Sequence, residues 1–175
     1  VMEKSISIIS SHDKKDTVTK LALGLSYENG IVMVCSIKNF DDLFATLGTD
    51  FIPFYESIVN ELAIICKRTK GNIVSLSEEE FVITWSSNNT HRYNMASRCA
   101  LLLRDVLNKQ IRAVHSESSV CIGLVEGGMY SGNMGTSSQR VYRVFGSAMR
   151  TAKVLSTVSK TWGIDIVVSQ SMFSQ

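Results

Sequence analysis

The stretch that most constrains the fold is GIVMVCSI, at residues 30–37, where apolar residues follow one another without alternation. A strand with one face in water alternates apolar and polar side chains, whereas an unbroken apolar run is typical of a strand buried on both faces. Residues 30–37 are therefore predicted to form a strand inside a covered sheet. The chain has 175 residues, 45% of them hydrophobic, which is enough for one domain with a substantial core.

A helix and a hairpin are predicted after this strand. Apolar residues at three- and four-residue spacing predict a helix over 51–69, with Asp50 as its cap and Gly71 closing it. Two short apolar runs, at 72–76 and 80–85, are separated by only three residues. That separation is typical of a β-hairpin whose acidic turn is exposed to water.

The second half of the chain mixes helices and strands in the same way. The glycine-rich stretch GGMYSGNMG, at 127–135, lacks the spacing of a phosphate-binding loop and is predicted to be a hairpin turn. The order of elements predicts an α+β fold, with a ferredoxin-like, antiparallel-rich sheet and helices packed on it. The other predicted elements are helices at 91–110 and 147–160 and strands at 118–127, 140–146 and 164–169.

We expect one domain over residues 28–175, preceded by an N-terminal segment or linker over residues 1–27. Residues 1–10 fit either a strand or part of a helical linker. The net charge of +2, with scattered basic residues, argues against a nucleic-acid surface. No apolar stretch reaches the length of a membrane span, so the domain is expected to make no membrane contact of its own.

The four cysteines stand far apart in apolar runs and form no C-x-x-C pair. This spacing favours four buried, reduced thiols over a zinc site or a disulfide framework, with an oxidised pair as the open alternative. Reduced thiols predict a cytoplasmic location, either for the domain alone or for the cytosolic part of a larger or membrane-attached protein. The residues are Cys35, Cys66, Cys99 and Cys121.

Four stretches occur in an order and at a spacing that resemble a known family. They are VMVCSIKNF, KGNIVSLSEEEFVITW, VCIGLVEGGMYSGNMG and RVYRVFGSAMRTAKVL. Together they resemble the catalytic domain of class III nucleotide cyclases, the adenylyl and guanylyl cyclases, over roughly residues 28–173. The resemblance implies that two such domains pair head-to-tail and that ATP or GTP binds at their interface. It also implies two metal ions that promote attack of the ribose 3′-hydroxyl on the α-phosphate.

The resemblance assigns positions to the two metal-binding carboxylates of the family. The first would stand at Ser36, in SIKNF, where family members have Asp-Ile-x-Gly-Phe. A neutral hydroxyl does not replace an anionic ligand of Mg²⁺, and Lys38 adds positive charge nearby. The second would stand at Glu79, an oxygen donor whose side chain is one methylene longer. Three acidic residues in a row are also typical of an exposed turn.

The other functional positions of the family differ as well. The base-reading lysine would stand at Ser75, and its partner, an aspartate in adenylyl cyclases, at Arg143. The asparagine and arginine that stabilise the transition state would stand at Arg150 and Val154. Arg150 keeps a charge that attracts phosphate, but cations are also common on exposed helix faces. The residues that do match the family belong to its scaffold rather than to its chemistry. They are Gly71, Phe81, Gly123, Gly132, Gly135, Gly146, Ala152 and Leu155.

We therefore expect a degenerate cyclase homology domain, a pseudocyclase that acts as a dimerisation or regulatory module without a cofactor. Its partner would be a second copy or another cyclase-type domain, contacted through the face around 72–85 and 127–145. Two alternatives stay open. One is a divergent subunit of an active adenylyl or guanylyl cyclase, which would form cAMP or cGMP with Mg²⁺ or Mn²⁺. The other is a module that binds a nucleotide without turnover.

Overall fold

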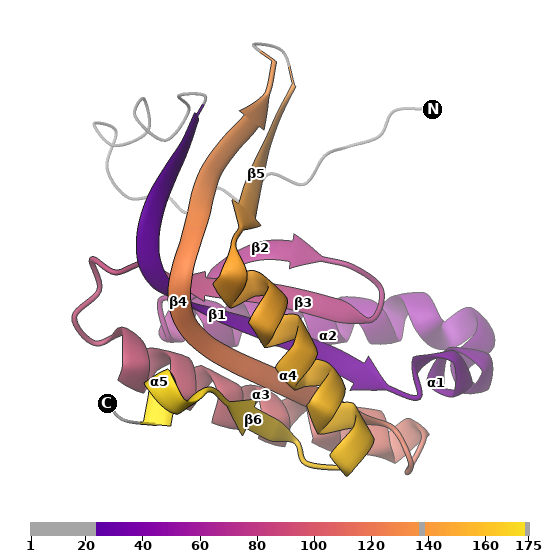
Figure 1. Ribbon diagram of the computed structural model, residues 1–175. Coiled ribbons are helices and arrows are strands. Elements are labelled where there is room, and N and C mark those ends of the chain that lie inside the picture. Colours follow the sequence, from indigo (N-terminus) through magenta and orange to yellow (C-terminus); the bar gives the residue numbers. More distant parts are fainter. Residues whose placement is uncertain (1–23, 137–138, 174–175) are drawn as a thin grey trace.

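A computed structural model describes residues 24–136 and 139–173 of the chain (Figure 1). The prediction for residues 1–10 lies outside the described residues. The strands are β1 (Gly24–Lys38), β2 (Asn72–Leu76), β3 (Glu80–Trp85), β4 (Ser119–Gly135), β5 (Arg140–Phe145) and β6 (Ile166–Val168). The helices are α1 (Phe40–Leu47), the 3₁₀ turn η2 (Gly48–Asp50), α2 (Phe51–Arg68), α3 (Arg92–Val114), α4 (Ser147–Trp162) and α5 (Gln170–Phe173).

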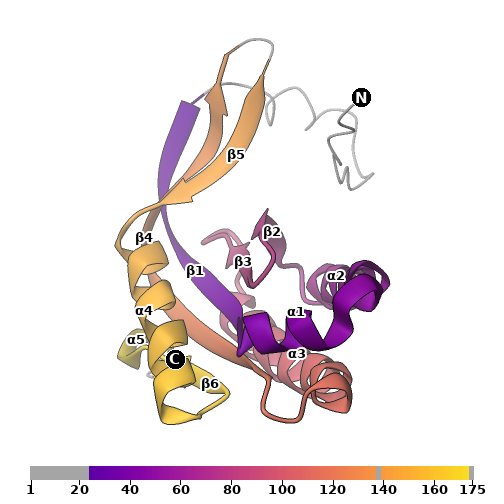
Figure 2. The same cartoon turned by 90° about the vertical axis from the view of Figure 1, so that its right-hand side faces the viewer.

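All six strands form one sheet in the order β2-β3-β1-β4-β5, with β6 beside β4. Every pair along this path is antiparallel, and β6 alone runs parallel to its neighbour. Helices pack on both faces of the sheet (Figures 1 and 2). The prediction of an α+β fold with an antiparallel-rich sheet is confirmed.

The run that opened the sequence analysis is the centre of this sheet. β1 pairs with β3 on one side and with β4 on the other. Because side chains alternate along a strand, its residues supply two separate cores. Ile31 and Met33 belong to the core beneath α2 and α3, and Val32 and Val34 to the core beneath α4. The prediction of a strand buried on both faces is confirmed, although the strand begins earlier, at Gly24.

The prediction of a turn at 127–135 is wrong. These residues continue β4, and the reversal of the chain comes after Gly135. They pair with the first residues of β1, from Gly30 opposite Gly127 to Gly24 opposite Asn133. At Gly132 the absence of a side chain lets β4 approach β1 closely, because a Cβ there would meet the Gly24 carbonyl oxygen at 2.1 Å.

The end of α2 also differs from its prediction. Asp50 precedes the helix as predicted, but its side chain makes no capping hydrogen bond. The left-handed residue after the helix is Lys70, with φ 53°, rather than Gly71. The Gly71 N–H donates to the Cys66 carbonyl oxygen at 2.9 Å, which closes the helix in a Schellman-type cap. Gly71 is needed for packing instead, since a Cβ there would lie 2.9 Å from the Trp85 ring.

The outer parts of β1, β4 and β5 project beyond the rest of the domain (Figures 1 and 2). We call this projection, residues 24–29, 127–135 and 140–145, the arm. Glu28 ties its base to the body, because its carboxylate accepts hydrogen bonds from the Ser86 hydroxyl (2.6 Å) and the Ser87 N–H (3.2 Å). Within the arm, the same carboxylate accepts a hydrogen bond from the Ser131 hydroxyl (3.0 Å). Partial burial alone raises the pKa of Glu28, but these hydrogen bonds outweigh it and lower the pKa below its ordinary 4.5.

Replacement of Gly123 by alanine is expected to destabilise the domain by about 1–3 kcal/mol through overpacking. A Cβ at Gly123 would meet the Ala152 carbonyl oxygen at 2.2 Å and the Ser156 nitrogen at 2.6 Å, both in the backbone of α4. Urea unfolding measures the change. Gly127→Ala is the matched control, because a Cβ there would meet only Ala148 of the same helix, at 3.4 Å. Equal effects of the two substitutions would contradict the packing account.

Glu28→Gln is expected to lower the free energy of unfolding at neutral pH by about 1 kcal/mol, since the amide accepts weaker hydrogen bonds. The pKa of Glu28 is lower in the folded chain, so its contribution is present above about pH 4.5 and is lost as the pH falls below that value. Urea unfolding between pH 7 and pH 3 should show the difference from the unmodified protein shrinking on acidification. The exposed Glu117 supplies the control, Glu117→Gln. A difference that does not change with pH would refute the assignment.

Candidate functional site

Ser36, the predicted position of the first family carboxylate, lies beneath α4. Ser36 is buried near the end of β1, on the face of the sheet that α4 covers. Its Oγ lies 2.6 Å from the Ser156 Oγ of α4, and Ser156 also donates to the Cys121 carbonyl oxygen at 3.0 Å. The Ser36 hydroxyl is thus part of a closed hydrogen-bond network between β1, β4 and α4.

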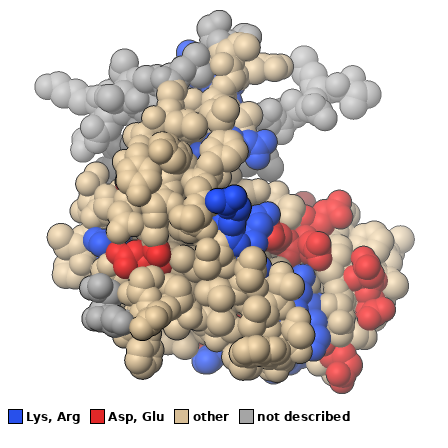
Figure 3. All heavy atoms as spheres, in the orientation of Figure 1, with Lys and Arg blue, Asp and Glu red and all other residues tan. Residues whose placement is uncertain are grey.

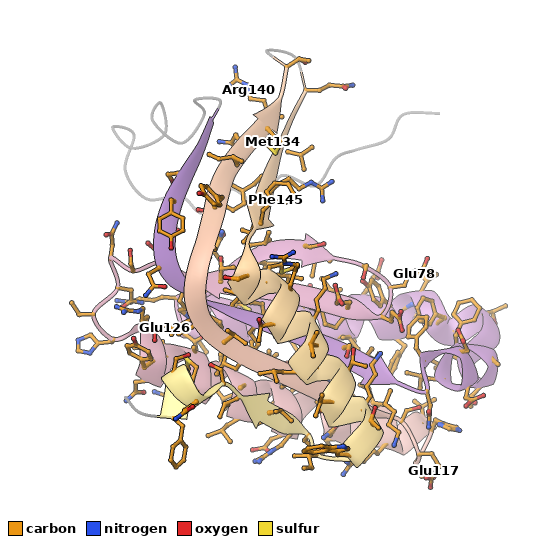
Figure 4. The ribbon with its side chains drawn as sticks, viewed as in Figure 1. Glu78, Glu117, Glu126, Met134, Arg140 and Phe145 are labelled. Atoms are coloured by element: carbon orange, nitrogen blue, oxygen red, sulfur yellow. The ribbon has the colours of Figure 1, made fainter. Side chains whose placement is uncertain are left out.

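The turn between β2 and β3 lies against this end of β1. Glu80 stands opposite Ser36 in the strand register, and the Ile37 N–H donates to the Glu79 carbonyl oxygen at 2.9 Å. Ser77 holds the turn, because its hydroxyl donates to the Glu80 carbonyl oxygen at 2.9 Å. The structure therefore brings Ser36 and Glu79 together at one end of the sheet. Figure 4 marks this turn with the labelled Glu78.

Two lysines of α4 reach the acidic turn. The Lys153 Nζ lies 2.8 Å from a Glu80 carboxylate oxygen, and the Lys160 Nζ lies 3.7 Å from one of Glu79. The two lysines are seven residues apart, so two helical turns place them on the same side of α4. Both pairs are partly exposed, and each contributes at most about 1 kcal/mol to stability. The two pairs matter more for the charge at this edge, because they give the carboxylates of Glu80 and Glu79 cationic partners from the chain itself.

The other predicted site residues lie farther apart. Ser75 is half-buried on β2 beside a β-bulge, opposite Val82. Arg143 is exposed on the arm and pairs across from Gly132, at the far end of β1 from Ser36. Arg150 and Val154 are exposed on α4. The roles assigned to all these positions remain predictions.

Sequence reasoning missed Ser156, Lys160 and the pairing of Lys153 with Glu80. The seven-residue spacing of the two lysines indicates a shared helix face, and the run of three glutamates indicates their complement. No local pattern reveals that the helix crosses the turn. That contact joins segments more than 70 residues apart, and it depends on the packing of α4 on β4 at Gly123.

Two surface cavities lie near α3 and α4. A surface cavity of about 430 Å³ lies between α3 and Asp165, and another of about 310 Å³ follows the outer side of α4. Neither is lined by Ser36, Ser75 or Glu79, but the second is lined by Lys153 and by the predicted site residue Val154. Within residues 24–136 and 139–173, no group of three or more His, Cys, Asp or Glu side chains is placed to hold a metal ion.

All four cysteines are buried and free, and burial raises the pKa of the Cys35 and Cys121 thiols. The prediction of buried thiols without disulfides is confirmed. In the part of the chain that the structure describes, no helix is long and apolar enough to cross a membrane.

Solved structures with the same fold include nucleotide cyclases and a cyclase-like protein. A bacterial light-regulated adenylyl cyclase matches with a TM-score of 0.76 and 16% identity, over 89% of this chain and 47% of that one. The adenylyl cyclase CyaB from P. aeruginosa matches with 0.74 and 16%, over 87% and 82%. A class III adenylyl cyclase-like ATP-binding protein from Pseudomonas aeruginosa matches with 0.70 and 15%, over 86% and 35%. This chain thus spans about half of the light-regulated cyclase, and such identities show a shared fold alone.

Sequence comparison gives the family directly. Curated protein sequences contain no match to the chain. A family model described as the adenylate and guanylate cyclase catalytic domain matches residues 25–174, from the second residue of β1 to beyond the end of α5. The chain therefore belongs to the family of adenylate and guanylate cyclase catalytic domains.

Proposed function

We propose that this domain is a catalytically inactive cyclase homology domain that serves as a dimerisation and regulatory module in cyclic-nucleotide signalling. The observation that carries the proposal is the environment of Ser36. The residue at the position of the first metal carboxylate is an uncharged serine, buried under α4 and hydrogen-bonded to Ser156 at 2.6 Å.

The residues at this edge do not fit a pair of divalent cations. Mg²⁺ takes oxygen ligands in near-ideal octahedral geometry and is usually held by one or two carboxylates. The Ser36 hydroxyl supplies no charge and faces Ser156 rather than solvent. Glu79 and Glu80 keep their carboxylates, but Lys160 and Lys153 are paired with them. A metal ion would have to displace these ammonium groups and would gain no second carboxylate from β1.

The positions that would read the base and stabilise the transition state support the same conclusion. Arg143 is a donor where an adenylyl cyclase needs an acceptor for the adenine amino group. Val154 has no polar atom with which to stabilise charge on the phosphates. Ser75 lies half-buried beside a bulge, and its hydroxyl is much shorter than a lysine side chain.

Pairing with another domain is supported by the exposed face of the arm. Cross-strand partners share a face, so the register places six apolar side chains on one side of the arm. Each is 42% to 64% exposed, which is typical of a contact surface rather than of a free one. Figure 4 labels two of them, Met134 and Phe145. The six residues are Leu25, Tyr27, Tyr130, Met134, Val141 and Phe145.

Binding of a nucleotide without turnover is a second candidate. Arg143 and Arg150 are exposed and have no ion-pair partner among the described residues, so both are available to an anion. One protein of the same fold is described as adenylyl cyclase-like and ATP-binding. An active divergent subunit is the third candidate, with Glu79 as its remaining metal-binding carboxylate.

Titration and turnover assays separate these candidates. The purified domain is expected to form neither cAMP nor cGMP from ATP or GTP with Mg²⁺ or Mn²⁺, since the first carboxylate is absent. Isothermal titration of each nucleotide with and without metal should show no metal-dependent affinity. Metal-dependent product formation that Glu79→Ala abolishes and Glu117→Ala preserves would overturn the proposal. Nucleotide binding without turnover would establish the second candidate.

The arm face generates a separate prediction about assembly. The double variant Tyr130→Ser/Phe145→Ser removes two directly paired aromatic side chains from this face. It is expected to weaken self-association, or association with another cyclase-type domain, at least about tenfold. Sedimentation velocity over a concentration series measures the change. Tyr142→Ser is the control, because Tyr142 is exposed on the opposite face of the same strand. Unaltered association of the double variant would exclude the arm as the contact.

A further inference from the structure

The larger of the two surface cavities is lined entirely by polar and charged side chains. Its volume of about 430 Å³ lies within the range of small-molecule sites. Five of the six lining residues come from α3, and the sixth, Asp165, directly precedes β6. None of the six is a predicted cyclase site residue or part of the arm. They are Arg104, Asp105, Asn108, Lys109, Arg112 and Asp165.

The sheet separates this cavity from α4. Leu103 and Leu107 of α3 belong to the core on one face of the sheet, and Ala152 of α4 belongs to the core on the other (Figure 2). On the face shown in Figure 3, acidic atoms gather toward the side of α1, α2 and the hairpin, and basic atoms lie closer to the middle. The charged lining on α3 is therefore a separate group from the lysines of α4 and the acidic turn.

Asn108 is the least exposed residue of the lining, and its amide is held in one orientation. It is 7% exposed, and its Oδ1 accepts a hydrogen bond from the Val120 N–H at 2.8 Å. The Nδ2 therefore points away from Val120, and it donates to an Asp165 carboxylate oxygen at 3.4 Å. An amide nitrogen carries two hydrogens, so a second buried donor is available to a ligand in the cavity.

Lys109 and Arg112 carry positive charge that the chain itself does not use fully. They stand three residues apart on α3, so their side chains are neighbours on the helix surface. Lys109 has no ion-pair partner among the described residues. Arg112 lies 3.6 Å from an Asp165 oxygen, which is too far for a hydrogen bond. Arg104, in contrast, is paired with Asp105 at 2.7 Å.

The free groups of the cavity are donors, so a matching ligand must be an acceptor with negative charge. Three basic and two acidic side chains line the cavity, which leaves one net positive charge. A phosphate group carries negative charge and several acceptor oxygens, and the planar guanidinium of arginine fits two of these oxygens at once. A neutral or cationic ligand would leave the Lys109 ammonium without a partner.

We propose that this cavity binds a phosphate group, either as free phosphate or as part of a small metabolite. The phosphate oxygens accept hydrogen bonds from Lys109, Arg112 and the Asn108 amide. Asp165 limits the affinity, because its carboxylate competes for Arg112 and repels the anion. The inference goes beyond the proposed function, and it holds whether or not the domain pairs with another. A phosphate held there joins α3 to the segment before β6 and stabilises the folded domain.

A titration of the full 175-residue chain with inorganic phosphate tests the site. Two-dimensional ¹H–¹⁵N NMR follows the Asn108 side-chain amide at about pH 7.5, where phosphate is mainly a dianion. The ionic strength is kept at about 0.1 M, because salt screens the exposed cations. A saturable shift of this signal is expected, with a Kd of about 1 mM.

A parallel titration with glycerol phosphate distinguishes the two sources of the phosphate group. Tighter binding of the ester than of inorganic phosphate would support the cavity as the site of a phosphorylated small molecule. Equal or weaker binding of the ester would support it as a site for free phosphate.

Three variants test the assignment of the residues, and circular dichroism verifies that each is folded. Lys109→Gln with Arg112→Gln is expected to weaken phosphate binding at least about tenfold. The control, Lys67→Gln with Arg98→Gln, removes the same charge from exposed positions outside the cavity and should change the affinity less than about twofold. Asp165→Asn removes the competing carboxylate and is expected to tighten binding at least about threefold, a gain that misfolding does not produce.

Three results would overturn the site. The first is the absence of a saturable shift with either ligand up to about 20 mM. The second is an equal loss of affinity in the two double variants, which would reflect net charge rather than this cavity. The third is a set of shifts around Arg143 and Arg150 instead of Asn108. That result would assign the anion to the second candidate function and leave this cavity without a ligand.

Discussion

The direct contact of α4 with β4 at Gly123 is the constraint on which the rest of the candidate site depends. Without a side chain at Gly123, the backbone of α4 rests on the strand at Ala152 and Ser156. That close approach places the Ser156 hydroxyl within 2.6 Å of Ser36. It also places Lys153 within reach of the hairpin turn. One missing side chain thus positions the polar network and the ion pair at the same edge.

The carboxylates at this edge are neutralised by lysines rather than by a metal ion. A bound metal ion neutralises carboxylates only while it is bound, whereas Lys153 and Lys160 are part of the chain. Under the proposed function, Glu80 and Glu79 therefore have cationic partners without metal or nucleotide. A module of that kind would not need a bound metal ion to balance the charge at this edge. Its regulation would then depend on whether the partner is present rather than on occupancy of this edge.

The arm gives the proposed pairing two components of different kind. Apolar side chains such as Tyr130 and Phe145 would supply buried area. Burial of apolar area contributes to affinity but does not fix the orientation of the partner, because the hydrophobic effect is not directional. A charged group on the arm such as Arg143 acts over a longer distance and disfavours wrong orientations of the partner. The base of the arm is hydrogen-bonded to the body through Glu28, so the arm is held in place before a partner arrives. A surface held in this way loses less conformational entropy on binding.

The sequence by itself determined the elements whose signals are local. The unbroken apolar run at 30–37, the helical spacing after Asp50 and the hairpin spacing before Trp85 each predict the observed element. Motif order also predicted the family, and with it the serine at the position of a carboxylate. Only the tertiary structure decided that 127–135 is a strand, because glycines that favour a turn are overridden by pairing with residues 24–30, about a hundred positions earlier. It likewise decided that Ser36 meets Ser156 and that the acidic turn meets lysines, since those contacts join segments that only the packing of α4 brings together.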